Sequence, residues 1–145
     1  MDQPLLGLHG LSVEFSTAQG QAGAVDTVDL TLEPGEILGL VGESGCGKTV
    51  LSLAILGLVQ PPGRIVAGEV LFQGRDLRTL APEELRRVRG ADVAMIFQEP
   101  MTSLNPVLRV GFQVAEPLML HRGLTKAQAL DKAKDLLALV GLPEP

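Results

Sequence analysis

The pattern Gly-x-x-x-x-Gly-Lys-Thr at residues 42–49 constrains the fold of this chain more than any other feature of its sequence. It follows the apolar run 37–41, which lacks alternation and is typical of a central strand covered on both faces. It precedes the apolar segment 50–56, which we interpret as a buried helix, stopped by Pro-Pro-Gly at 61–63. A strand, a glycine-rich loop and a helix in this order predict a phosphate-binding loop, or P-loop.

The chemistry of phosphate binding explains the spacing of this motif. Its glycines permit backbone angles that turn successive N–H groups toward an anion, and they leave room for close approach. The helix that begins near Lys48 would point its positive end at the same phosphates. We expect Lys48 to reach the β- and γ-phosphates of a nucleotide and the Thr49 hydroxyl to ligate Mg²⁺. The alternative is a glycine-rich turn that binds nothing. The predicted nucleotide-binding residues of the loop are Gly42, Glu43, Ser44, Gly45, Cys46, Gly47, Lys48 and Thr49.

Cys46 is the only cysteine of the chain and lies inside this loop. A helix N-terminus lowers the pKa of a thiol, so a reactive thiol is conceivable here. We favour the simpler interpretation that a small residue fits the loop. A single cysteine forms no internal disulfide, which agrees with a reducing compartment.

Alternating apolar and polar residues at 11–15 and 28–33 predict two half-buried strands. The small polar segment 16–23 between them predicts a loop or a wide hairpin. Residues 70–72 predict a short strand, and the apolar run 93–97 predicts a second strand covered on both faces. Strands separated by helices indicate an α/β fold with a parallel core sheet.

Two helix starts are visible in the second half of the chain. Residues 82–84, Pro-Glu-Glu, combine a proline with acidic side chains suited to a first helical turn. Residues 125–128, Thr-Lys-Ala-Gln, form a capping box that opens a helix, which Gly141 and Pro143 end. Between them, prolines 100, 106 and 117 are expected to break up the segment.

The composition indicates one ordered globular domain. Hydrophobic residues make up 46% of the 145 residues and charged residues 20%, with a formal net charge of -5. An acidic surface argues against nucleic-acid binding, so we interpret the basic run 86–89 as an exposed helix face. No apolar run reaches the roughly 18 residues that span a bilayer, and the N-terminus lacks the pattern of a signal peptide. We therefore predict a cytoplasmic domain that reaches a membrane only through partners.

Two stretches resemble the ATPases of ABC transporters. Residues 32–49 are similar to their P-loop region, and residues 95–106, Met-Ile-Phe-Gln-Glu-Pro-Met-Thr-Ser-Leu-Asn-Pro, to their Q-loop. The Q-loop has the form found in ATPases of dipeptide, oligopeptide and nickel importers, and Ser-Leu-Asn-Pro at 103–106 is its most specific part. The resemblance covers essentially the whole chain. It implies a nucleotide-binding core with N-terminal antiparallel strands at 1–97, then the Q-loop and the start of a helical subdomain at 98–145.

The resemblance also implies roles for two residues outside the P-loop. Gln98 would ligate Mg²⁺ and the attacking water, in a segment that senses the membrane partner; alternatively, it is a polar residue at the end of a strand. Phe15 matches the position of an aromatic side chain that stacks on adenine. Because Phe15 also fits the strand pattern, core packing stays open beside stacking.

The departures from the family pattern concern catalysis. The Leu-Ser-Gly-Gly-Gln signature, the Walker B strand ending in Asp-Glu and the switch histidine are absent from the sequence. Residues 93–99 imitate Walker B, but Gln98 stands where the metal-binding Asp is expected, so Glu99 is not assigned as a general base. Neither His9 nor His121 lies in a setting similar to that of the switch histidine. We assign no catalytic residue and expect an incomplete domain, the N-terminal part of such an ATPase.

The resemblance therefore predicts ATP and Mg²⁺ binding in an ATPase that powers import of peptides or nickel. Its expected partners are membrane permease subunits and a second ATPase subunit, at the cytoplasmic face of the membrane. This segment alone is expected to bind nucleotide weakly and to hydrolyse it barely or not at all. Two alternatives remain: a non-hydrolytic nucleotide-binding or permease-docking module, and another P-loop enzyme such as a small kinase.

Overall fold

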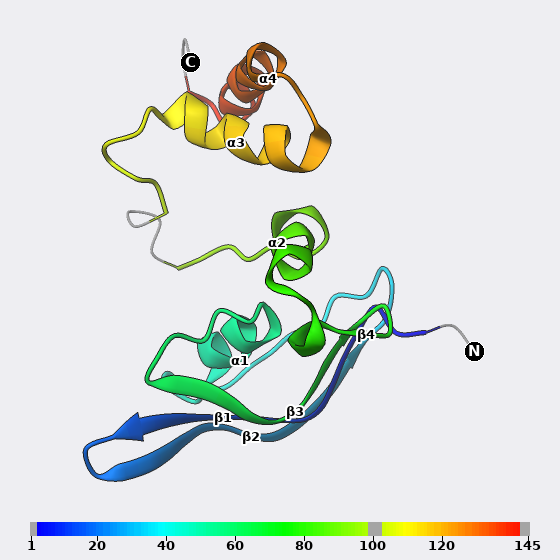
Figure 1. Cartoon of the computed structure of the whole chain (residues 1–145), viewed down its shortest axis with the longest axis vertical. Coiled ribbons are helices and arrows are strands. Elements are labelled where there is room, and N and C mark those ends of the chain that lie inside the picture. Colours follow the sequence, from blue (N-terminus) through cyan, green and yellow to red (C-terminus); the bar gives the residue numbers. More distant parts are fainter. Residues whose placement is uncertain (1–2, 99–102, 143–145) are drawn as a thin grey trace. The chain divides into compact units, whose positions relative to one another are not determined.

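The computed structural model describes residues 3–98 and 103–142, which fall into two compact units, Met1–Leu85 and Arg86–Pro145 (Figure 1). Glu99, Pro100 and Pro143, which the sequence analysis discussed, lie outside the described residues. The boundary between the units falls within a helix. The functional division after residue 97 stays a prediction.

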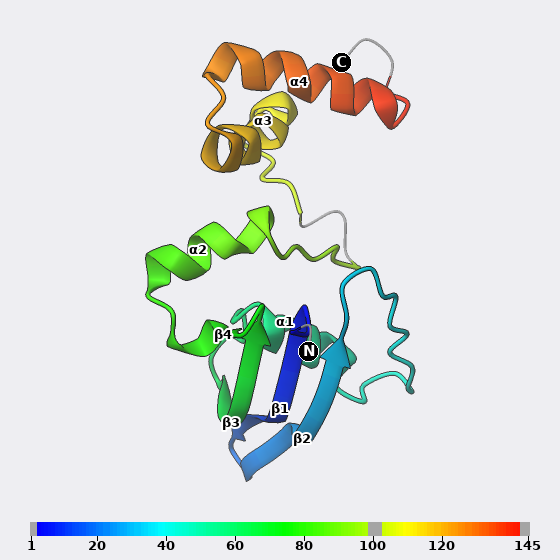
Figure 2. The same ribbon diagram turned by 90° about the vertical axis from the view of Figure 1, so that its right-hand side faces the viewer.

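The first unit is built on a four-stranded antiparallel sheet of order β2-β1-β3-β4 (Figure 2). Its strands are β1 (Leu6–Thr17), β2 (Gly20–Leu32), β3 (Gly63–Phe72) and β4 (Arg75–Asp76). The predicted strands at 11–15, 28–33 and 70–72 are confirmed. Of the predicted loop or wide hairpin at 16–23, the structure shows a hairpin, in which β1 and β2 pair as far as Thr17 and Gly20. Small polar residues marked a turn, but cross-strand hydrogen bonds extended both strands into it.

Helix α1 (Lys48–Ile55) covers one face of this sheet (Figures 1 and 2). Leu51 and Ala54 are its buried residues. The side chains buried with them from the sheet and its surroundings include Leu8, Leu11, Val13, Val25, Leu56, Val70 and Leu77. Burying one Leu or Val side chain contributes about 1.5–3 kcal/mol. This apolar layer therefore fixes α1, and with it the end of the glycine-rich loop, against the strands.

Neither apolar run that predicted a central strand forms one. Residues 37–41 and 94–97 lie outside any strand, and Ile37, Val41 and Ile96 are 97%, 93% and 98% exposed. A strand covered on both faces needs neighbouring strands for its N–H and C=O groups. Within residues 3–98 and 103–142, β1 to β4 pair only among themselves, so these runs have no strand beside them. The predicted parallel core sheet is thus wrong for the described part of the chain.

Helix α2 (Pro82–Ala91) begins where Pro82 predicted, with Glu83 and Glu84 in its first turn. It is preceded by the short 3₁₀ helix η1 (Leu77–Thr79), whose cap Asp76 accepts a hydrogen bond from the backbone N–H of Arg78. Near its end, Arg89 and Gly90 leave the helical conformation.

The second unit contains the helical hairpin α3 (Val110–Arg122) and α4 (Lys126–Leu139). Ala115, Ala129 and Ala133 are fully buried between them, which lets the two helices approach closely. The capping box of α4 is confirmed: Thr125 Oγ1 accepts from Gln128 N and Gln128 Oε1 accepts from Thr125 N. The expectation that Pro117 breaks the segment is wrong, since α3 runs through it. Leu118 and Met119, which follow Pro117, pack against the alanine cluster, so the packed face of α3 continues past the proline.

Candidate nucleotide-binding site

The loop at residues 42–47 leads directly into α1 through backbone angles that favour glycine. Gly45 and Gly47 have φ values of 83° and 96°, in the left-handed region. Gly47 is also the N-cap of α1. A Cβ at Gly47 would overlap the carbonyl oxygen of Ala24, and one at Gly42 would lie 2.6 Å from Cys46 Sγ. Glycine at 47 is therefore required by close approach as well as by conformation, whereas at Gly42 the close neighbour is the Cys46 side chain alone.

The contact with Ala24 ties the end of the loop to an irregularity in the sheet. Val13 pairs with Val25 and Glu14 with Gly23, which leaves Ala24 as an extra residue of β2. Such a bulge bends the strand locally. The sequence analysis did not single out Ala24. The run of small residues around it was a signal, because small side chains permit backbone segments to approach.

Lys48 turns its side chain back over the loop. Its Nζ donates hydrogen bonds to the carbonyl oxygens of Gly42 and Glu43, each at 2.7 Å, and lies 3.3 Å from Cys46 Sγ. These bonds hold the ammonium group at the loop that precedes α1. The positive charge of Lys48 therefore lies at the loop, and its predicted contact with phosphates stays a prediction.

The start of α1 suits an anion for a second reason. Within the described chain, α1 has no side-chain cap and no acidic residue in its first turn. The N–H groups at a helix start have no partner within the helix and carry partial positive charge. A helix start of this kind, beside an ammonium group, is a binding site for phosphate.

The predicted metal ligands fall in different units. Thr49 is exposed in the first turn of α1, in the unit with the P-loop. Gln98 is exposed in the other unit. The donor set of a hydroxyl with phosphate oxygens fits Mg²⁺, which prefers oxygen ligands and keeps several waters. Among residues 3–98 and 103–142, no three His, Cys, Asp or Glu residues are grouped to hold a metal ion.

Phe15 is half-buried on β1, where it pairs with Ala22 and Gly63. A Cβ at Gly63 would lie 2.6 Å from the Phe15 ring, so the ring covers this glycine. Phe15 lies two residues after Val13 on β1. Val13 pairs with Val25 of β2, and Val25 lies beside Gly47. The ring thus packs on β3, and Phe15 lies on β1, the strand beside β2, whose Ala24 and Val25 lie next to Gly47. Core packing and adenine stacking both remain open.

Cys46 is exposed, and its sulfur lies beside the Lys48 ammonium. It also occupies the space next to Gly42. This arrangement agrees with a small residue that fits the loop, and the predicted inertness of the thiol stays a prediction.

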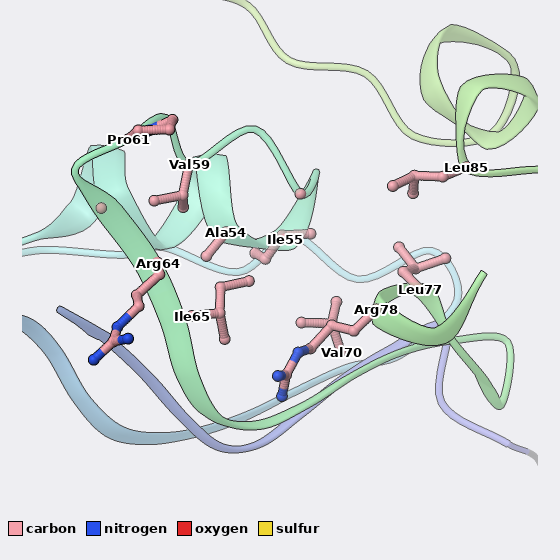
Figure 3. A pocket seen from close by; sticks show the side chains of 12 residues that line it. Ala54, Ile55, Val59, Pro61, Arg64, Ile65, Val70, Leu77, Arg78 and Leu85 are labelled. Atoms are coloured by element: carbon pink, nitrogen blue, oxygen red, sulfur yellow. The ribbon is translucent and has the colours of Figure 1, made fainter. Parts of the chain in front are cut away.

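A hollow of about 420 Å³ lies between α1 and β3, apart from the P-loop (Figure 3). The aliphatic side chains of Ala54, Ile55, Ile65 and Val70 converge on it. None of residues 42–49 lines it. The predicted phosphate-binding loop therefore lies apart from this apolar hollow.

The fold and the loop together define the class of protein. The sequence profile of the family described as "ABC transporter" matches residues 25–144, and the chain belongs to this family. No helix within the described residues is long and apolar enough to cross a membrane.

Individual relatives agree with this assignment. The chain is 48% identical over 141 residues to the dipeptide transport ATP-binding protein DppD of Escherichia coli (strain K12), covering 97% of the chain and 43% of that protein. It is 46% identical over 142 residues to the oligopeptide transport ATP-binding protein OppD of Bacillus subtilis (strain 168), covering 97% of the chain and 40% of that protein. The chain thus spans less than half the length of these relatives.

A solved structure shows the same fold. The chain is similar to the dimeric structure of MJ0796, described as a bacterial ABC transporter cassette, with a TM-score of 0.81 and 24% identity. The similarity covers 96% of this chain and 58% of that one. The predicted α/β class, with N-terminal antiparallel strands and the beginning of a helical region in an incomplete domain, is confirmed.

Proposed function

We propose that the chain binds Mg-ATP through residues 42–49, as the front part of an ATPase that powers peptide import. The observation that carries this proposal is the Lys48 ammonium, held by two carbonyl oxygens beside the uncapped start of α1. Membership of the ABC transporter family supports ATP as the nucleotide. A structure of the MJ0796 cassette bound to ADP and Pi, similar to this chain at a TM-score of 0.81, also supports it.

Each predicted site residue has a distinct role in this proposal. The backbone of residues 42–47 surrounds the phosphates, and Lys48 moves from the loop carbonyls to the β- and γ-phosphate oxygens. The Thr49 hydroxyl would hold Mg²⁺, which would neutralise part of the charge of the phosphates. Gln98 adds a ligand to Mg²⁺ or to the attacking water. Phe15 stacks on the adenine ring.

Hydrolysis requires a general base that we assign to no residue of this sequence. The segment therefore binds nucleotide weakly and turns it over barely or not at all by itself. A rate well above background that disappears when Lys48 is replaced by alanine would contradict this part of the proposal.

The names of the relatives favour peptides as the transported substrate. The relatives named above are dipeptide and oligopeptide transport proteins. Membrane permease subunits, reached through the Q-loop and the helical hairpin, and a second ATPase subunit are the proposed partners. The dimeric state of the MJ0796 cassette supports the second of these. The proposed location is the cytoplasmic face of the membrane, as a peripheral subunit.

Titration of the chain with a fluorescent ATP analogue, with and without Mg²⁺, tests the proposal. We expect Mg²⁺-dependent binding that Lys48→Ala weakens at least about tenfold, because the main positive charge at the phosphates is lost. Lys132→Ala is the matched control. It removes the same charge from an exposed pair with Asp135 in α4, and we expect it to change affinity less than about twofold. Equal affinity of the Lys48→Ala variant and the unaltered chain would refute nucleotide binding at this loop.

A further inference from the structure

Phe15 has small residues as its neighbours on both adjoining strands. It pairs with Gly63 of β3 on one side and with Ala22 of β2 on the other. Directly opposite residues of an antiparallel pair have Cβ atoms about 4.5–5.5 Å apart, so a large neighbour would cover the ring. Gly63 has no side chain and Ala22 has only a methyl group, so neither partner covers the Phe15 ring.

The tip of the Phe15 ring fills the space that a side chain at Gly63 would take. A Cβ at Gly63 would lie 2.6 Å from Cε1 and 2.8 Å from Cζ of this ring, and 2.8 Å from Cγ1 of Val59. Val59 lies in the segment between α1 and β3 and lines the apolar hollow (Figure 3). The ring therefore rests on Gly63 beside Val59, and the missing side chain at 63 sets how closely it approaches β3.

Backbone hydrogen bonds fix the strands on either side of this contact. The N–H of Ser16 donates to the carbonyl oxygen of Pro62 at 3.2 Å, and the N–H of Gly63 donates to that of Gln60 at 2.8 Å. β3 thus begins at a closed turn that is bonded to the residue after Phe15. The backbone of Gly63 lies outside the left-handed region, so an alanine there would meet only the steric contact.

We propose that Gly63 and Ala22 are positioning residues for the stacking of Phe15 on adenine. Gly63 lets the tip of the ring lie against β3, and the methyl group of Ala22 leaves an aromatic face open to a planar base. This inference rests on the proposed function, in which Phe15 stacks on the base. Packing and stacking then concern different parts of the same half-buried ring. Its tip packs on Gly63 and Val59, and its open face binds the base.

An alanine at position 63 would displace the ring and leave the strands in place. The contacted atoms are at the far end of the Phe15 side chain, which can turn about its own bonds, whereas β1 and β3 are held together by their ladder. Stacking requires a defined position of the ring beside the base, so a displaced ring loses the base. The phosphates, which the proposed function assigns to residues 42–49, do not depend on the position of this ring.

Calorimetric titrations with Mg-ATP and with inorganic tripolyphosphate separate the base from the phosphates. Tripolyphosphate lacks the base, so its affinity reports the phosphate-binding loop alone. Gly63→Ala should weaken ATP binding at least about fivefold, which corresponds to losing a base stacked on an aromatic side chain. The affinity for tripolyphosphate should change less than about twofold.

Gly23→Ala is the matched control for Gly63→Ala. Gly23 lies on β2 in the same sheet, its φ is outside the left-handed region, and a Cβ there would meet no atom within 4 Å. The control makes the same chemical change without touching the ring. It should leave the affinities for ATP and for tripolyphosphate unchanged.

Two further variants test whether the effect runs through the ring. Ala22→Leu, at an exposed position, places a large side chain opposite Phe15 and should also weaken ATP binding at least about fivefold without changing tripolyphosphate binding. It decides the question if Gly63→Ala does not fold. In a Phe15→Ala background, Gly63→Ala should cause no further loss of ATP affinity, because the ring through which it acts is gone. A merely structural role of Gly63 would give the same loss with or without the ring.

The outcomes distinguish this inference from the proposed function. If the unaltered chain binds neither ATP nor tripolyphosphate, the proposed function fails, and the roles of Gly63 and Ala22 fail with it. In a chain that binds both ligands, unchanged ATP affinity of the folded Gly63→Ala or Ala22→Leu variant overturns only the inference. An equal loss of ATP and tripolyphosphate affinity also overturns it, since damage to the fold would then account for the effect.

Discussion

At the scale of single residues, the candidate site depends on positions where no side chain fits. Gly47 combines a left-handed backbone with direct contact to the Ala24 carbonyl, whereas Gly45 has the left-handed backbone alone. These two glycines therefore separate the cost of conformation from the cost of steric overlap. The sequence motif fixes Gly47 and leaves position 45 variable, in agreement with this difference.

Replacing Gly47 with alanine should lower the free energy of unfolding by more than replacing Gly45. A left-handed conformation costs a residue with a Cβ about 1–2 kcal/mol, and both variants incur this cost. Only Gly47→Ala also displaces β2 or the start of α1, so it should additionally weaken binding of the ATP analogue. Urea unfolding and the nucleotide titration measure the two effects. Equal losses in both variants would show that the Ala24 contact is unimportant.

At the scale of elements, helix α4 is stabilised more by the capping box at its start than by the exposed ion pair on its surface. The Thr125–Gln128 capping box satisfies N–H groups at its start. The Lys132–Asp135 pair lies on the surface at 3.5 Å, with side chains 57% and 70% exposed. Capping interactions are worth more than exposed pairs, because water screens the latter.

Thr125→Ala should therefore destabilise α4 by about 0.5–2 kcal/mol. Lys132→Ala, on the same helix, should cost less than about 0.5 kcal/mol. Hydrogen exchange of the α4 amides reports both changes locally. A larger effect of Lys132→Ala than of Thr125→Ala would contradict this ranking.

At the scale of the whole molecule, the described chain leaves apolar strand-like runs exposed. Ile37 and Ile96 are 97% and 98% exposed, while Leu11 is fully buried beneath α1. Exposed apolar residues with strand propensity promote association with other chains. Their contribution to the stability of the described fold is small, because they bury almost no surface.

Ile37→Lys and Ile96→Lys should accordingly reduce self-association of the chain without lowering its free energy of unfolding. The core control Leu11→Ala should cost about 2–5 kcal/mol, since it removes buried volume. Light scattering at increasing concentration and urea unfolding make the comparison. Loss of stability in either lysine variant as large as in Leu11→Ala would show that these residues are buried after all.

The features of this protein that could be predicted from its sequence are those that depend on residues close together in the chain. The glycine-rich loop and the start of α1, the alternation of β1 and the capping box at Thr125 all depend on positions a few residues apart. Backbone preference, side-chain alternation and local hydrogen bonds act over this range, so a single sequence reports them.

Only the tertiary structure decided the features that depend on a distant partner. The apolar runs 37–41 and 93–97 predicted central strands. A strand forms only beside another strand, and within residues 3–98 and 103–142 no strand lies beside these runs. The same reason explains why Ala24 beneath Gly47 went unpredicted. The sequence by itself determined the glycine-rich loop and the starts of α1, α2 and α4, because these depend on neighbouring residues. Long-range packing determined which segments have strand partners.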